Sequence, residues 1–114
     1  MSLLDAAQVH AVTTLAWRYL CVGRAQDACV LFELLVKLMP ARMELRLALA
    51  HALLGCGKPV AALGELEVLG SSHDPAAHFL SGKALARVGR MADARVAFDR
   101  FRECRQATPT HAPF

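Results

Sequence analysis

Three glycines divide this chain of 114 residues into repeating units, and their spacing limits what the chain can fold into. Gly23, Gly57 and Gly89 each follow an apolar stretch, and an alanine stands five residues after every one of them. The intervals between the glycines are 34 and 32 residues. A period of this length, with a glycine between two apolar stretches of helical length, predicts a series of stacked helical hairpins.

Start and stop signals place six helices around these glycines. Ser2, with Asp5 three residues later, resembles a capping box that opens the first helix. Gly23 supplies the left-handed residue that ends this helix, while Pro59 and Asp74-Pro75 suit the first turns of later helices. The expected helices cover about 2–21, 25–38, 41–54, 59–70, 75–89 and 91–104, and residues 106–114 are expected to form a flexible tail.

The repeats carry the residue types that are typical of tetratricopeptide (TPR) repeats. Small residues at two positions per repeat let paired helices approach closely, and aromatic side chains fill the space beside them. The small residues are Ala16, Ala28, Ala50, Ala62, Gly82 and Ala94, and the aromatic ones are Tyr19, Phe32 and Phe98. We therefore expect an all-α fold, a right-handed superhelical stack of three TPR-like helix pairs. It forms a single domain over residues 1–105, with repeats at about 9–42, 43–74 and 75–105.

The composition favours a cytoplasmic binding protein. Hydrophobic residues make up 55% of the chain, and a small domain has much surface, so part of this excess is expected to be exposed at a partner site. An Ala- and Leu-rich core is the alternative explanation. The four cysteines contain no CxxC pair, which favours a reducing compartment. A signal-peptide pattern and a long charge-free apolar run are both missing, so direct membrane insertion is not expected.

In a TPR stack the first helix of each pair lines a concave groove, and the repeat geometry assigns the residues that face it. This set is mostly apolar and includes a tryptophan and a phenylalanine, so we expect the groove to bind an apolar segment or an amphipathic helix of a partner protein. The expected groove residues are His10, Thr13, Trp17, Leu20 and Cys21 from the first helix, Glu44, Leu47, His51 and Leu54 from the third, and Phe79, Lys83, Ala86 and Arg87 from the fifth.

Trp17 has two possible roles. It is either an interface anchor in the groove or a core residue packed on the second helix. Tyr19 and Phe32 already supply the aromatic pocket of this repeat, which favours the groove for Trp17. Aromatic anchors of this kind dominate the energetics of protein interfaces.

The helix expected at 41–54 is apolar on nearly every side. Between Leu45 and Leu54 only Arg46 and His51 are strongly polar. Such a helix is expected to be covered on most of its surface. Neighbouring helices alone would provide this cover, or a bound segment in the groove would complete it, and we favour the second interpretation.

Other functions find little support in the sequence. The five histidines and four cysteines lack metal-ligand spacing, and no cofactor is expected. Gly55-Cys56-Gly57-Lys58 lacks the spacing of a phosphate-binding loop, and no residue set supports catalysis. The residues from Ser81 onward are basic, but acidic residues are interleaved with them. We interpret this region as a solvated helix surface, with an acidic patch on a partner protein as a second possibility, rather than as a nucleic-acid site.

Several residues beyond the generic repeat resemble the YscY family of type III secretion chaperones. They are the run 23–31, Trp17 six residues before Gly23, the tetrapeptide Ser72-His73-Asp74-Pro75, and Ala94-Arg95 with aromatic residues after it. The resemblance covers about residues 12–104. The tetrapeptide and the position of Trp17 are the parts that TPR repeats in general do not share.

The resemblance implies a small cytoplasmic protein of the bacterial injectisome. Members of this family bind YscX-type proteins, which are exported early substrates, and keep them soluble and ready for export. They are also linked to the cytoplasmic domain of the export gate. The alternatives are a needle-subunit co-chaperone of the injectisome and a general TPR scaffold that self-associates through its groove. An enzyme is not expected, and the sequence does not predict the bound segment or the stoichiometry.

Overall fold

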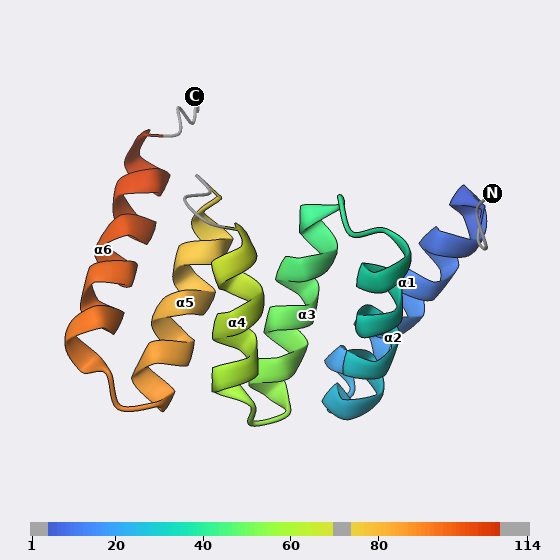
Figure 1. The fold of residues 1–114 in the computed structure, drawn as a ribbon, viewed down its shortest axis with the longest axis horizontal. Coiled ribbons are helices and arrows are strands. Elements are labelled where there is room, and N and C mark those ends of the chain that lie inside the picture. Colours follow the sequence, from blue (N-terminus) through green and yellow to red (C-terminus); the bar gives the residue numbers. More distant parts are fainter. Residues whose placement is uncertain (1–4, 70–73, 108–114) are drawn as a thin grey trace.

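The computed structural model describes residues 5–69 and 74–107, and every regular element in these ranges is an α-helix (Figure 1). The six helices are α1 (Ala6–Cys21), α2 (Ala25–Leu38), α3 (Met43–Gly55), α4 (Pro59–Leu69), α5 (Pro75–Arg87) and α6 (Met91–Ala107). They form the pairs α1–α2, α3–α4 and α5–α6. The predicted all-α stack of TPR-like helix pairs is therefore confirmed.

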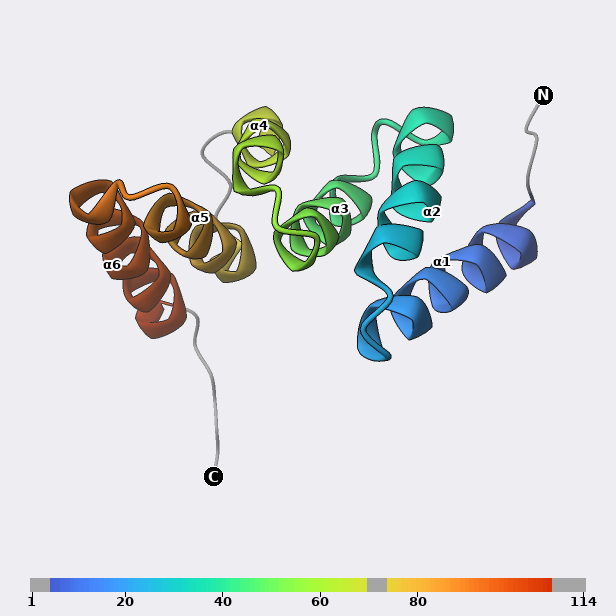
Figure 2. The same cartoon turned by 90° about the horizontal axis from the view of Figure 1, so that it is seen from below.

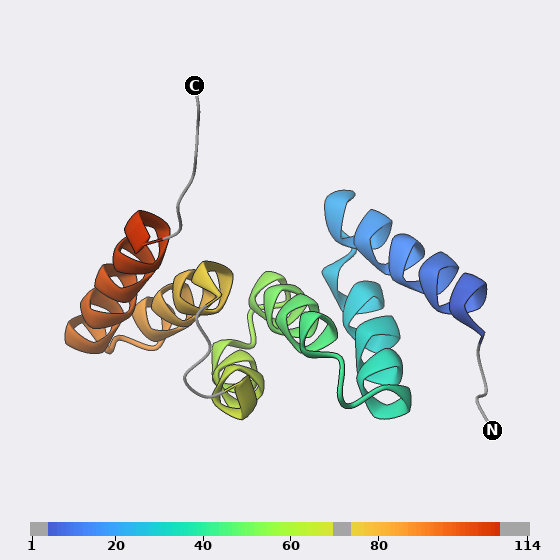
Figure 3. The same ribbon diagram turned by 90° about the horizontal axis from the view of Figure 1, so that it is seen from above.

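The helices lie side by side in a single row. Each one packs against the next along the chain, and α3 also contacts α5. The views from below and above place α2 and α4 on one side of the row and α1, α3 and α5 on the other (Figures 2 and 3). The first helices of the three pairs thus share one face of the molecule, and α6 covers the end of the row next to α5.

The same turn ends the first helix of every pair. Gly23, Gly57 and Gly89 have φ angles of 83°, 77° and 85°, a left-handed conformation that favours glycine. The residue after each glycine donates its backbone N–H to a carbonyl five residues earlier, as Arg24 does to Tyr19 at 2.8 Å. This pattern is the Schellman motif, which satisfies carbonyl groups that the end of a helix leaves free. The glycine period of the sequence therefore corresponds to one turn geometry used three times.

The small consensus residues lie where paired helices meet. Ala16, Ala28, Ala50 and Ala62 are completely buried, and Ala94 and Gly82 are also buried. The closest approach is at Gly82, where an added Cβ would lie only 2.6 Å from the ring of Phe98 in α6. Since ordinary carbon–carbon contacts are about 3.5–4.0 Å, α5 and α6 pack at a distance that leaves no room for a methyl group at Gly82.

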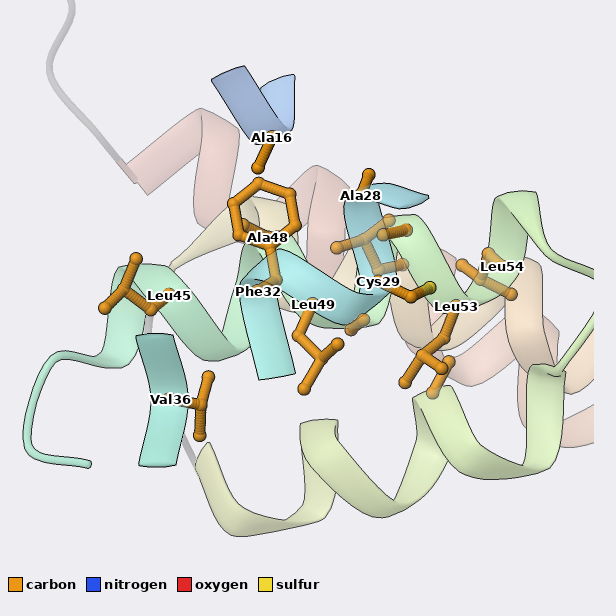
Figure 4. Packing of buried hydrophobic residues seen from close by; sticks show 14 of the residues in the cluster. Ala16, Ala28, Cys29, Phe32, Val36, Leu45, Ala48, Leu49, Leu53 and Leu54 are labelled. Carbon is orange, nitrogen blue, oxygen red and sulfur yellow. The ribbon is translucent and has the colours of Figure 1, made fainter. Parts of the chain in front are cut away.

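One apolar core runs through α1 to α5. Phe32, Leu35 and Leu54 are its largest fully buried side chains, and α3 lies at its centre with seven buried residues. Figure 4 shows the ring of Phe32 next to Ala16 of α1, where the small side chain leaves space for the ring. The core thus repeats the pairing of a small residue with an aromatic one that the sequence predicts.

Two cysteines meet inside this core. The sulfur atoms of Cys29 in α2 and Cys56 at the end of α3 are 3.1 Å apart, and both residues are free thiols. Burial, with a hydrogen bond to Cys56 as the second cause, raises the pKa of the Cys29 thiol to about 12. Cys29 is therefore protonated at neutral pH and packs as a small apolar side chain.

Three predictions about helix ends need correction. The capping box of α1 consists of Asp5 and Gln8, whose backbone N–H groups donate to each other's side chains, while Ser2 lies outside the described residues. Helix α3 begins at Met43 rather than at 41 and ends at Gly55. Helix α6 continues to Ala107, so the predicted tail is wrong for residues 106 and 107. The guanidinium of Arg105 lies 5.6 Å from the centre of the Phe101 ring, a contact that supports this last turn.

Two glycine substitutions test the packing of α5 on α6. We expect Gly82→Ala to lower the free energy of unfolding by about 1–3 kcal/mol, because the new methyl group overlaps the ring of Phe98. Gly64→Ala is the matched control, since Gly64 is exposed inside α4 and an added Cβ meets nothing within 4 Å. It should raise the free energy of unfolding by about 0.5–1 kcal/mol. Urea unfolding followed by circular dichroism measures both. Equal effects of the two substitutions would contradict the close approach at Gly82.

Candidate functional site

An apolar pocket of about 420 Å³ opens on the face that α1, α3 and α5 share. All three helices contribute side chains to it, and Glu44 and His51 are its only ionisable lining residues. The lining residues are Trp17 from α1, Glu44, Leu47, Ala48 and His51 from α3, and Ala76, Phe79 and Leu80 from α5. The pocket therefore lies in the groove that the repeat geometry predicts.

Trp17 forms one wall of the pocket. Its ring packs edge-on against the buried ring of Phe32 in α2, with 5.4 Å between the ring centroids, and lies 5.9 Å from the imidazole of His51. The side chain nevertheless remains 40% exposed. Trp17 is thus packed on Phe32 along one edge of the indole, while another part of the ring faces the pocket.

Phe79 forms the opposite wall. It contacts Phe98 and Phe101 of α6, with ring centroids 5.9 Å and 5.2 Å away, and is itself 40% exposed. The amino group of Lys83, one turn further along α5, lies 5.6 Å from the centre of the Phe79 ring. Helix α6 therefore supports the pocket from behind without lining it.

Helix α3 forms the floor between these walls. Its neighbours cover most of it, since seven of its residues are buried. Ala48 belongs to this buried set, whereas Leu47 and His51 are half-buried and line the pocket. The neighbouring helices thus account for most of the cover that the apolar sequence of α3 requires. The pocket surface of Leu47 and His51 is the part that they leave open.

Of the charged side chains around the pocket, Glu44 has a partner of opposite charge and Lys83 is included in no ion pair of the described residues. Glu44 accepts a hydrogen bond from Arg42 at 3.1 Å, and its own backbone N–H together with this arginine lowers the pKa of the carboxyl group. Burial is the main cause that lowers the pKa of His51, and the positive charge of Lys83 is the second. His51 is therefore neutral at physiological pH, and the charge of Lys83 reaches into the pocket.

The other predicted groove residues lie outside this pocket. His10 and Cys21 are exposed on α1, and the half-buried Thr13 donates its hydroxyl to the carbonyl of Val9 at 2.7 Å. Leu20 is half-buried against the core, and Ala86 is half-buried on α5.

Leu54 requires a correction. It is only 2% exposed and is one of the largest fully buried side chains, so the structure places it in the core instead of the groove. Nη1 of Arg87 donates to the carbonyl of Leu54 at 2.5 Å, which ties the end of α5 to the end of α3. Leu54 packs within the core cluster that runs through α1 to α5.

Three lining residues were not predicted, namely Ala48, Ala76 and Leu80. Ala76 stands at the same position of its repeat as His10 and Glu44, so the repeat register could have predicted that it faces the groove. Ala48 and Leu80 also share a repeat position, and both are buried at the base of the pocket. The observed site is therefore narrower along the helices and deeper than the predicted groove.

The basic region on α6 behaves as a solvated helix surface. Arg90 pairs with Asp93 at 2.8 Å, and Arg102 pairs with Asp99, with all four side chains largely exposed. Among the described residues, no group of three or more His, Cys, Asp or Glu side chains is arranged to hold a metal ion. No helix in this part of the chain is long and apolar enough to cross a membrane.

The fold and the pocket together define a TPR-like helical repeat protein with an apolar site on its shared helix face. No protein-family model matches the chain, and no curated protein matches it in sequence. Among solved structures it is similar to PcrH in a crystal structure with the chaperone binding region of PopB, with a TM-score of 0.87 and 20% sequence identity. The match covers 96% of this chain and 90% of that one, so the likeness in fold extends over nearly the whole stack.

The contact between Trp17 and His51 predicts a pH-dependent fluorescence signal, because Trp17 is the only tryptophan and protonated imidazole quenches indole emission. Since the pKa of His51 is lowered, quenching should have its midpoint below about 6.5. Lys83→Gln should move this midpoint upward, and His51→Gln should abolish the transition. An unchanged midpoint in Lys83→Gln would show that this charge does not reach the pocket.

The same shift predicts how stability depends on pH. Unfolding returns His51 to its ordinary pKa of about 6.5, so the unfolded chain binds more protons than the folded one between the lowered value and 6.5. The contribution of His51 to stability is therefore present above about pH 6.5 and is lost as the pH falls through this window. Urea unfolding at several pH values should show that the free energy of unfolding depends less on pH in His51→Gln than in the wild-type protein.

Proposed function

We propose that this protein is a type III secretion chaperone that binds an exported partner through the apolar pocket between Trp17 and Phe79. The observation that carries this proposal is the pair of aromatic side chains, each 40% exposed, on opposite walls of a pocket with an apolar floor. Half-exposed aromatic residues beside a preformed apolar pocket are typical of sites that anchor a partner protein.

The shape of the site favours a segment of a partner over a whole folded surface. A pocket of about 420 Å³ has room for one or two large apolar side chains and is too small for a folded domain. An apolar segment or one face of an amphipathic helix meets this requirement. The structural likeness to PcrH supports the same mode, because that protein was crystallised with a binding region of PopB.

The resemblance of the sequence to the YscY family supports a finer assignment. On this basis the partner is a YscX-type secretion substrate, which the chaperone keeps soluble in the bacterial cytoplasm before export. The complex then docks at the cytoplasmic domain of the export gate. Binding rather than catalysis is the proposed activity, because the pocket presents apolar side chains and a neutral imidazole instead of a nucleophile paired with a base.

Co-expression with a YscX-type protein tests the proposal. We expect a soluble heterodimer that Trp17→Ala weakens by about 30-fold, because truncating an aromatic anchor costs about 2 kcal/mol. Leu47→Ser should add to the loss by placing a hydroxyl group on the apolar floor. Isothermal titration calorimetry measures both effects. Val60→Ala is the control, since Val60 is 72% exposed on α4 and does not line the pocket.

Each alternative predicts a different outcome of this experiment. A needle-subunit co-chaperone would bind the needle protein and leave the YscX-type protein unbound. A general scaffold would form a homodimer through the same aromatic side chains, and sedimentation would detect it without any secretion substrate. A heterodimer that survives the combined Trp17→Ala and Leu47→Ser substitutions would show that the partner binds elsewhere on the stack.

A further inference from the structure

One half-buried positive charge next to the pocket is included in no ion pair of the described residues. Lys83 is half-buried on α5, with its amino group 5.6 Å from the centre of the Phe79 ring. The ion pairs within residues 5–69 and 74–107 involve five arginines and do not include Lys83. The one carboxylate that lines the pocket, that of Glu44, already pairs with Arg42. The interaction that the structure shows for Lys83 is therefore the one with the aromatic face of Phe79.

Another half-buried cation shows how the fold treats such a charge elsewhere. Arg46 of α3 pairs with Glu65 of α4 at 3.2 Å, and their side chains are 18% and 28% exposed. This pair lies between two helices that cover it. The half-buried Arg46 thus has a carboxylate partner within the protein, whereas no ion pair of the described residues includes Lys83.

An apolar segment in the pocket would remove water from Lys83. Covering an ammonium group without a partner is costly, because the lost hydration is not replaced. A carboxylate on the bound segment would replace it with a charge-assisted hydrogen bond, while a basic side chain there would add repulsion. Arg87, one further turn along α5, adds a second positive charge in this direction while it donates to the carbonyl of Leu54.

Resting on the function proposed above, we infer that the bound segment is an acidic-apolar one. Its large apolar side chain occupies the space between Trp17 and Phe79, and an Asp or Glu next to this anchor pairs with Lys83. The carboxylate lies toward the C-terminal end of α5, whereas Glu44, in the first turn of α3, marks the other end of the pocket. The position of Lys83 thereby also gives the segment a direction along the groove.

Selection from a phage library of random twelve-residue peptides tests this inference on the full chain. Wild-type protein should enrich peptides with a large apolar residue and an Asp or Glu at a fixed spacing from it. Lys83→Gln should enrich the apolar residue without the acidic one. Lys37→Gln removes the same charge from an exposed position on α2 and should enrich the wild-type pattern.

Binding of two synthetic peptides measures how much the charge pairing contributes to affinity. The best selected peptide should lose affinity by about tenfold when its Glu is replaced by Gln, because a hydrogen bond between charged groups is lost. The same replacement should change binding to Lys83→Gln by less than twofold. Trp17 fluorescence measures both affinities.

Two results would overturn the inference, and they differ in what they mean. In the first, the selected peptides depend on Trp17 but contain no acidic residue, or the Glu and Gln forms of the best peptide bind equally well. Such a result would leave the proposed groove function in place and refute the charge pairing. A selection that enriches no peptide dependent on Trp17 would refute the groove function and the inference together.

Discussion

The structure depends on the close approach of paired helices at residues with almost no side chain. Ala16 next to the ring of Phe32, and Gly82 against Phe98, set how near α1 lies to α2 and α5 to α6. Because interior packing is dense, a larger residue at either place would push a helix outward. Each such shift would move the walls of the pocket, since α1 carries Trp17 and α5 carries Phe79. The small residues thus determine the shape of a site that they do not touch.

The local features of the fold could be predicted from the sequence because they depend on local chemistry. The three left-handed glycines and the Asp74 cap of α5 require only neighbouring residues, and α2 begins and ends where the sequence predicts. The errors in the predicted helix ends arose where more than one residue near the end of a helix could begin or end it. Asp5 serves as the N-cap of α1, and Gln8 reaches back to its backbone N–H. Helix α6 continues to Ala107, and Arg105 in this last part lies over the ring of Phe101.

The site was only partly predictable from the sequence. The repeat register predicts which side of a helix a residue lies on, but it does not predict how deeply the side chain is buried. Trp17, Leu47, His51 and Phe79 follow from the register and meet in one pocket. Leu54 follows from the same register yet lies in the core, because the burial of a side chain depends on how the neighbouring helices pack around it. The contact between Cys29 and Cys56 has no sequence signal either, since it depends on how α2 packs against the end of α3.

Core residues and pocket-wall residues lie mainly on different helices. Helix α3 has buried residues on most of its surface, so a substitution there changes stability and binding together. The aromatic walls and Lys83 belong to the flanking helices α1 and α5, where each side chain is half-buried or more exposed. Changes at these positions alter what the pocket binds, although Trp17 and Phe79 also pack on rings of α2 and α6, so that truncating either one costs stability as well. Stability therefore resides mainly in α3 and its neighbours, while the specificity of the pocket resides in the residues that face it from either side.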